Sequence, residues 1–107
     1  MRLFFEKICI PPETNLLEAI SVIDKGSLQL ALIVDSNKIL IGTLTDGDIR
    51  RGLLKGIDLD QKIEKIMNKK FFSIKNTDDF KSGFYKVSKM GIKKLPVVDQ
   101  EGRIEFK

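Results

Sequence analysis

The sequence predicts an α/β (α+β) fold made of two copies of one β-α-β-β-α unit, the second of them incomplete. The main observation is a constant offset, because Val97-Val98-Asp99 follows Ile33-Val34-Asp35 by 64 positions. The same offset preserves apolar character at many other positions, among them Leu16 and Phe80, Ile20 and Phe84, Leu28 and Ile92, and Leu40 and Ile104. A second observation is that helix-like and strand-like patterns alternate in the same order in both copies.

The first copy begins with a short extended segment that ends at Pro11-Pro12. A helix is expected next, because Thr14 or Asn15 can cap it and Asn15 with Glu18 resembles a capping box. Four apolar residues then recur at helical spacing, namely Leu16, Ala19, Ile20 and Ile23. Gly26 is expected to end this helix.

Two strands and a second helix complete the first copy. Residues 28–34 are almost continuously apolar, which predicts a strand covered on both faces, as in a parallel sheet. A turn over 35–38 leads into a second strand over 39–44. Residues 46–55 are expected to be helical, with Gly56 as the stop signal.

A linking segment follows, in which Asp60 is expected to cap a short helix whose residues Ile63, Ile66 and Met67 share one face. The second copy is expected to have the same elements in the same order. These are an extended segment, a helix capped by Thr77 and ended by Gly91, a strand containing Pro96, a turn, and a strand that begins at Arg103. It lacks the last strand end and helix of the unit. We therefore expect repeat 1 in residues 1–56, a linking segment in 57–70 and an incomplete repeat 2 in 71–107.

The composition excludes several classes of function. Histidine is absent and cysteine occurs once, so histidine catalysis, histidine-ligated metals and intrachain disulfides are excluded, and no metal site or required cofactor is expected. The lone Cys9 lies in an apolar stretch and is expected to be a buried, inert thiol. No apolar run approaches the roughly 18 residues of a membrane span, and no signal peptide appears, so a cytoplasmic domain without membrane contact is expected.

The net charge of +4, from 19 basic and 15 acidic residues, permits an anionic partner without requiring one. The basic side chains near residue 50 lack interleaved aromatic residues, so a nucleic-acid partner is not expected. The chain also lacks a glycine-rich nucleotide loop, a metal-binding carboxylate pair and a general base. We therefore expect no enzymatic activity in these 107 residues.

The segment Gly42–Arg51 is the densest cluster of polar residues and glycines, and it lies where a strand is expected to turn into a helix. A helix N-terminus presents unpaired N–H groups to an anion, so Thr45 is placed to bind a phosphate there. Asp48 could accept two hydrogen bonds from a vicinal diol such as a ribose. The alternative is structural: Thr45 or Asp46 caps the helix, and Asp48 complements its dipole.

In this context the chain resembles the cystathionine-β-synthase (CBS) domain family, whose modules occur as tandem pairs. The family pattern of glycine, hydrophobic residue, small residue, threonine, two residues and aspartate is similar to residues 42–48. Residues 95–99 with Gly102, and the linking run 59–68, also resemble the family. The form of Thr45–Arg51 looks most like pairs attached to sugar-phosphate nucleotidyltransferases.

The resemblance implies two repeats packed as a pseudo-twofold module that binds adenine nucleotides or related adenosyl ligands between them. AMP, ADP, ATP and S-adenosylmethionine are the ligands that it implies. By position, the threonine of the family contacts phosphate, the aspartate holds the ribose, and nearby backbone lines the base pocket. The ligand-binding residues implied in this way are Gly42, Thr45, Asp48, Ile10, Ala31, Leu32 and Lys94.

The second cleft is expected to be compromised. Its threonine and aspartate would lie beyond residue 107, and Phe106 replaces the glycine that corresponds to Gly42. Lys93 and Lys94 could still supply charge to a phosphate there, and the alternative is that both are solvated lysines at a strand edge.

Two functions follow from these observations. The first is a regulatory, adenosine-nucleotide-sensing module that modulates a fused or partner enzyme, such as a sugar-phosphate nucleotidyltransferase, by binding one of its conformations better than the other. The second is a dimerisation or interaction module that takes no ligand. Both predict a homodimer, since pairs of this family often associate through their helices.

Overall fold

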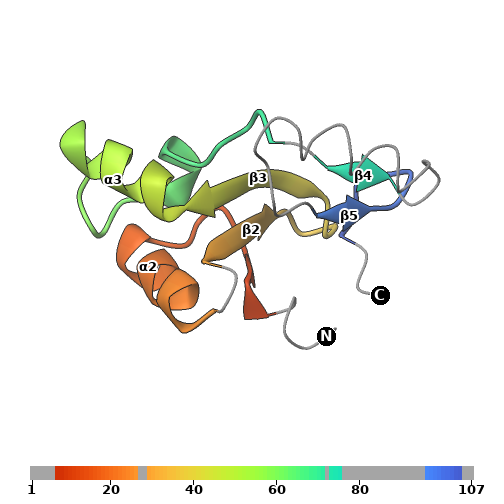
Figure 1. Ribbon diagram of the computed structural model, residues 1–107, viewed down its shortest axis with the longest axis horizontal. Helices are drawn as coiled ribbons and strands as arrows, with labels where there is room; N and C mark the ends of the chain where they lie inside the picture. The colour runs from red at the N-terminus through yellow and green to blue at the C-terminus, as the bar shows by residue number, and fades with distance from the viewer. Residues whose placement is uncertain (1–6, 27–28, 72, 76–95, 105–107) are drawn as a thin grey trace.

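The computed structural model describes residues 7–26, 29–71, 73–75 and 96–104 (Figure 1). Secondary structure follows the order that the sequence predicts, with mixed strands and helices. The elements are β1 (Cys9–Ile10), α2 (Leu16–Lys25), β2 (Leu30–Val34), β3 (Leu40–Thr45), α3 (Asp46–Leu54), a 3₁₀ helix η1 (Ile63–Lys65), β4 (Ile74–Lys75) and β5 (Val97–Val98). The predicted α/β fold class is therefore confirmed.

The first sheet has the order β1-β2-β3, so β2 lies between the other two strands. Its residues from Leu30 to Ile33 are all buried, which confirms the prediction of a strand covered on both faces. Ala31 and Ile33 contribute to one apolar cluster, and Leu30 and Leu32 contribute to another. The sheet is mixed, because β2 runs parallel to β1 and antiparallel to β3.

Helix α2 begins at the predicted cap. The side chain of Asn15 accepts a hydrogen bond from the backbone N–H of Glu18 at 2.8 Å. The predicted apolar face packs inward, with Leu16, Ala19 and Ile23 buried against the sheet. Gly26 ends the helix in an extended conformation, with φ −89° and ψ 138°, and not in the left-handed one that often follows a helix.

The predicted helix after Asp60 is wrong in its form and its cap. The structure has only the single 3₁₀ turn of η1, which no side chain caps. The preceding backbone pairs with the start of α2 instead, since Ile63 N–H donates to Thr14 C=O at 2.9 Å and Leu16 N–H donates to Gln61 C=O at 2.9 Å. Tertiary backbone hydrogen bonds therefore take the place of those that a longer helix would make.

The described part of the second copy reproduces the register of the first. Ile74 pairs in parallel with Val97, as Ile10 pairs with Ile33, and both members of the second pair lie 64 positions after those of the first. Pro96 was expected inside the strand, but it directly precedes β5. The N–H group that proline lacks is therefore not needed for the hydrogen bonds of β5. The predicted helix between Thr77 and Gly91 lies outside the described residues.

The hairpin turns of the two copies are also equivalent. In the first, Asp35 Oδ1 accepts hydrogen bonds from the N–H groups of Asn37 and Ile39, at 2.9 and 3.0 Å. In the second, Asp99 Oδ1 accepts from the corresponding residues Glu101 and Arg103, both at 2.9 Å. The repeat that the sequence offset predicts is thus present in the backbone geometry, although the boundaries 1–56, 57–70 and 71–107 stay a prediction.

Candidate functional site

The candidate site lies at the turn from β3 into α3. Thr45 is the last residue of β3 and the N-cap of α3, with extended backbone angles of −119° and 171°. Its hydroxyl oxygen accepts from the N–H of Asp48 at 3.4 Å, while its own N–H donates to Asp48 Oδ2 at 3.0 Å. The Thr45 hydroxyl also donates to Asp48 Oδ2 at 3.0 Å. The two predicted residues therefore form a reciprocal capping box.

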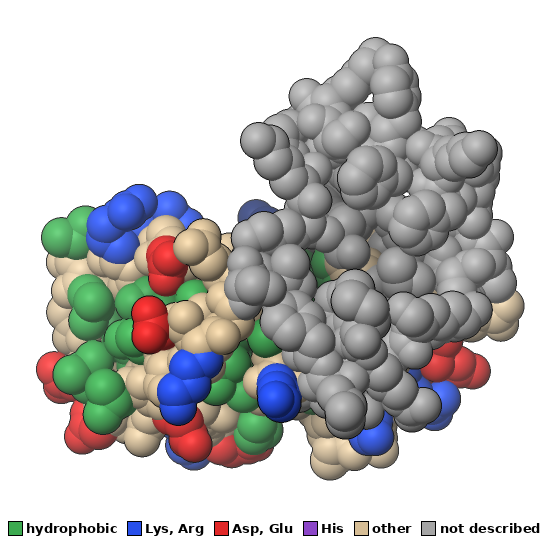
Figure 2. Space-filling view, turned by 60° about the horizontal axis from the view of Figure 1, so that its bottom comes forward, with side chains coloured by type: hydrophobic (Ala, Val, Ile, Leu, Met, Phe, Trp, Pro, Cys, Tyr) green, Lys and Arg blue, Asp and Glu red, His purple; other side chains and the backbone are tan. Residues whose placement is uncertain are grey.

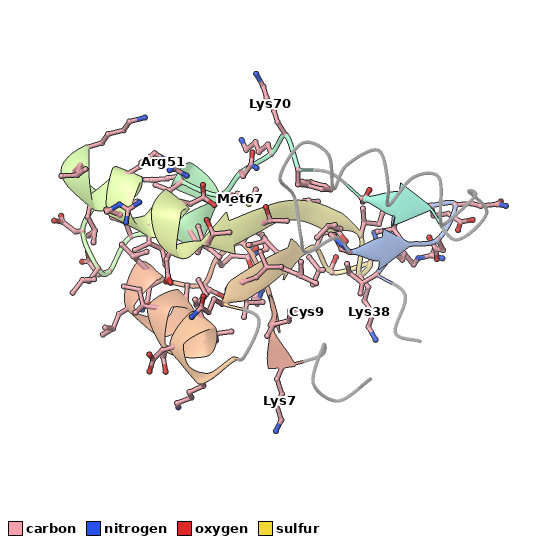
Figure 3. The ribbon with its side chains drawn as sticks, viewed as in Figure 1. Lys7, Cys9, Lys38, Arg51, Met67 and Lys70 are labelled. Atoms are coloured by element: carbon pink, nitrogen blue, oxygen red, sulfur yellow. The ribbon has the colours of Figure 1, made fainter. Side chains whose placement is uncertain are left out.

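A third residue joins this pair. Arg51 Nη2 donates to Asp48 Oδ1 at 2.8 Å from one turn further along α3 (Figure 3). The Asp48 side chain is only 14% exposed, whereas that of Arg51 is 61% exposed. The guanidinium lies over Gly47, where an added Cβ would be 3.2 Å from Arg51 Nη1. The sequence analysis placed Arg51 near the site but did not predict its contact with Asp48. Residues three apart on a helix, such as Asp48 and Arg51, can make such a contact.

Gly42 lies on β3 and is covered by Met67 from the linking segment (Figure 3). A Cβ at residue 42 would be 2.7 Å from Met67 Sδ, closer than real Cβ atoms approach a neighbour. The same segment pairs with β3, since Thr43 and Asn68 exchange backbone hydrogen bonds at 3.1 and 2.8 Å. Close packing of Met67 against the strand therefore explains why residue 42 of the predicted motif is glycine. A glycine in a strand often indicates such a close approach.

Two of the predicted base-pocket residues lie beside this turn. Ala31 pairs with Leu44 in the antiparallel ladder, next to the pair that Leu30 makes with Thr45. Leu32 lies one residue further along β2. The side chains of Ala31 and Leu32 are buried in different apolar clusters, so it is their backbone that could face a ligand.

Ile10 is further from the turn. It pairs with Ile33, which is three residues along β2 from Leu30, the partner of Thr45. At about 3.3 Å per residue this is a displacement of roughly 10 Å along the sheet. The structure therefore brings Thr45, Asp48 and the start of β2 together and places Ile10 at the opposite end of that strand. Lys94 and the predicted second cleft lie outside the described residues.

In residues 7–26, 29–71, 73–75 and 96–104, no group of three or more Cys, Asp or Glu side chains is arranged to hold a metal ion. Within the same part of the chain, no helix is long and apolar enough to cross a membrane.

Comparison with known proteins supports the resemblance that the motifs indicate. Residues 6–55 match the family model described as "CBS domain". An uncharacterized protein of Helicobacter pylori strain J99 is 38% identical over 69 residues, which make up 64% of this chain and 21% of that protein. An inosine-5′-monophosphate dehydrogenase of Aquifex aeolicus is 29% identical over 102 residues, 92% of this chain and 20% of that enzyme. The chain thus spans about a fifth of the length of these relatives.

A solved structure extends the similarity to the pair. The CBS domain pair of protein MJ0100, in complex with 5′-methylthioadenosine and S-adenosyl-L-methionine, superposes with a TM-score of 0.74 at 27% identity. The match covers 91% of this chain and 76% of that one. Residues 6–55 are therefore similar to a CBS domain, and the chain shares the fold of a CBS domain pair over most of its length.

Proposed function

We propose that the chain is a regulatory module that binds an adenosine nucleotide at the turn between β3 and α3 and thereby modulates an attached enzyme in the cytoplasm. The observation that carries this proposal is the position of Thr45 and Asp48, which are joined by hydrogen bonds at the N-terminus of α3, within the residues that match the CBS-domain model. The related pair of protein MJ0100 holds two adenosyl compounds, which supports a ligand with an adenosyl group here.

The proposed roles follow from the chemistry of each group. Thr45 and the first N–H groups of α3 would bind phosphate, as helix N-termini do. The Asp48 carboxylate would accept hydrogen bonds from the ribose hydroxyls. Backbone of Ala31 and Leu32, with Ile10 further along, would line the base pocket, and Lys94 would supply charge in the second cleft. Gly42 would act indirectly, by admitting Met67 against β3.

The linking segment connects this turn to the rest of the chain. It pairs with Thr43, two residues before Thr45, and also with the first turn of α2 through Leu59 and Leu17. A ligand that favours one position of the turn would therefore favour one position of the linking segment. Through that segment it would also favour one orientation of repeat 1 (1–56) relative to repeat 2 (71–107). Regulation of this kind requires the ligand to bind one conformation better than another.

Thermal denaturation of the chain with AMP, ADP, ATP and S-adenosylmethionine tests the proposal. At least one of them at millimolar concentration should raise the melting temperature, since a ligand that binds only the folded state stabilises it. Asp48→Ala should abolish the shift. Asp46→Ala is the matched control, because Asp46 is an exposed aspartate in the same helical turn and should leave the shift intact. If none of the four compounds stabilises the wild-type chain, nucleotide sensing is refuted.

For the attached enzyme we propose a sugar-phosphate nucleotidyltransferase. The support is the form of Thr45–Arg51, which resembles pairs attached to such enzymes. The inosine-5′-monophosphate dehydrogenase relative is a different enzyme, so the comparisons lend this identity no support of their own. The gene that encodes the full-length parent decides the matter, and a catalytic domain of any other class would overturn this part of the proposal.

A second candidate function, homodimerisation without a ligand, is favoured by four exposed leucines. Leu17, Leu53, Leu54 and Leu59 are 58%, 45%, 81% and 46% exposed. They belong to α2, to the end of α3 and to the segment after it, and Leu17 N–H donates to Leu59 C=O at 3.0 Å. Hydrophobic side chains also gather at this helical end in the space-filling view (Figure 2). Exposed apolar surface of this kind often marks an interface.

Light scattering coupled to size exclusion tests dimerisation. A wild-type dimer should become a monomer when Leu54 is replaced by Glu, because a charge in an apolar interface is costly. Lys38→Glu, at the other end of the molecule, is the control for added negative charge and should leave the dimer intact. A monomeric wild-type chain would exclude this function while leaving nucleotide binding untouched.

A further inference from the structure

The carboxylate of Asp48 is largely occupied before any ligand arrives. Its Oδ2 accepts from both the N–H and the hydroxyl of Thr45 at 3.0 Å, and its Oδ1 accepts from Arg51 Nη2 at 2.8 Å. A carboxylate has about four acceptor positions, so these three bonds leave about one. A ribose diol needs two, and one of the existing donors must therefore move aside.

Arg51 is the donor that can leave. The bond from Thr45 N–H belongs to the capping box that starts α3. The Thr45 hydroxyl, which makes the other bond, is held beside the carboxylate because its oxygen accepts from Asp48 N–H in the same box. Arg51 is instead attached by a long side chain that is 61% exposed, and its single described hydrogen bond is the one to Asp48. Its release would, however, leave the mostly buried carboxylate without its charged partner.

We infer that Arg51 exchanges Asp48 for the phosphate of the ligand and makes the site selective for phosphorylated nucleosides. This inference rests on the proposed function, since it assumes that Asp48 binds the ribose. In the exchange the diol replaces Arg51 on Asp48 Oδ1. The guanidinium, already placed over Gly47 in the first turn of α3, then pairs with the phosphate. Planar guanidinium groups bind phosphate strongly and with two hydrogen bonds.

The exchange distinguishes between adenosyl compounds. A nucleotide supplies both the diol for Asp48 and an anion for Arg51. Adenosine and 5′-methylthioadenosine supply the diol alone, so Arg51 loses an ionic hydrogen bond without replacement. S-adenosylmethionine is less favourable still, because its sulfonium carries a positive charge toward the guanidinium. AMP should therefore bind at least about tenfold more tightly than adenosine, which differs from it only by the phosphate.

Isothermal titration of the whole chain with AMP and with adenosine tests the inference. Arg51→Gln keeps a hydrogen-bond donor but removes the charge, and it should lower the ratio of the two dissociation constants about tenfold while adenosine binding stays equal or improves. Arg50→Gln is the matched control, with the same loss of charge at an exposed neighbouring position, and should keep the wild-type ratio. Melting temperatures without ligand should be similar, because glutamine can still donate a hydrogen bond to Asp48 and the lost cation is at an exposed side chain.

The possible results of these titrations separate the role of Arg51, the selection for phosphate and nucleotide binding itself. If the ratio is unchanged in Arg51→Gln, or falls equally in Arg50→Gln, the role of Arg51 is overturned while nucleotide binding stands. If wild type binds adenosine as tightly as AMP, phosphate selection is overturned in the same way. If neither compound binds the wild-type chain, both the proposed function and this inference fail.

Discussion

Ile39 and Arg103 occupy equivalent positions in the two copies of the repeat and pair with each other as an antiparallel bridge. Around this bridge the hydrogen bonds are reciprocal. Leu40 N–H donates to Gly102 C=O at 2.9 Å, and Ile104 N–H, 64 positions after Leu40, donates to Lys38 C=O at 3.1 Å. Such exchange of equivalent partners defines a twofold relation. The two hairpin turns therefore join the copies about a pseudo-twofold axis through residues 39 and 103.

The turn residues at this junction give the first prediction. Gly102 has φ +87° and its equivalent Lys38 has φ +65°, a region that disfavours residues with a side chain. An added Cβ at Gly102 would make only ordinary contact, 3.5 Å from Ile39 Cγ2, so strain and not crowding decides the effect. Gly102→Ala should lower the free energy of unfolding by about 1 kcal/mol.

The opposite substitution at the equivalent position, Lys38→Gly, tests the same strain. Lys38→Gly relieves the same strain but adds freedom to the unfolded chain, so a gain of about 0.5 kcal/mol is expected. Both values come from urea denaturation. A loss of stability in Lys38→Gly together with a gain in Gly102→Ala would show that backbone strain does not control this junction.

The second prediction separates helix capping from ligand binding. Thr45 and Asn15 each cap a helix through a side-chain oxygen, with distances of 3.4 and 2.8 Å to the accepted N–H. Thr45→Ala and Asn15→Ala should each cost about 1 kcal/mol of stability. Only Thr45→Ala should also remove the thermal shift caused by nucleotide. If both variants lose the shift to the same degree, Thr45 acts through stability alone.

The sequence was sufficient wherever local periodicity decides the structure. The apolar spacing and the Asn15 cap predicted α2, and the continuous apolar run predicted a strand buried on both faces. The repeat offset predicted a second copy of the unit, and Ile74 pairs with Val97 in the same parallel register as Ile10 with Ile33. These features depend on neighbouring residues or on copying one unit, so they can be read from one sequence.

Features that depend on distant segments were not predicted. The helix expected after Asp60 is replaced by one 3₁₀ turn, because backbone groups of that segment bond to Thr14 and Leu16, more than 40 residues earlier. The contact of Met67 with Gly42 likewise joins two segments whose approach no local pattern encodes. The site residues Thr45 and Asp48 were found by motif, but the involvement of Arg51 required the rotamers of the folded helix.

The third prediction concerns two glycines of α3 that have different surroundings. A Cβ at Gly52 would lie 2.9 Å from Ile66 Cγ2 and 3.2 Å from Ile57 Cγ2, both on stiff branched side chains. Gly52→Ala should therefore cost about 1–3 kcal/mol by overpacking. A Cβ at Gly47 would meet only the far end of the flexible Arg51 side chain. Gly47→Ala should stay within about 0.5 kcal/mol of wild type in the same denaturation series.

The fourth prediction is that Gly42 and Met67 are energetically coupled. A Cβ at residue 42 would be 2.7 Å from Sδ, 2.9 Å from Cγ and 3.3 Å from Cβ of Met67, so Gly42→Ala should cost about 1–3 kcal/mol. Met67→Ala should cost about 1–2 kcal/mol, since this side chain is only partly buried. Met67→Ala also removes the Cγ and Sδ atoms that crowd residue 42.

The double variant should therefore be more stable than the sum of the two losses predicts, by about 1 kcal/mol. Urea denaturation of the four proteins of the cycle measures this coupling. Leu17→Ala, an exposed change on α2, replaces Met67→Ala in a control cycle and should add to Gly42→Ala without coupling. Additive losses in the Gly42–Met67 cycle would mean that the linking segment moves as a body to admit the new methyl group. In that case β3 and the linking segment would be only loosely joined, and the proposed route from the nucleotide turn to the second repeat would lose its mechanical basis.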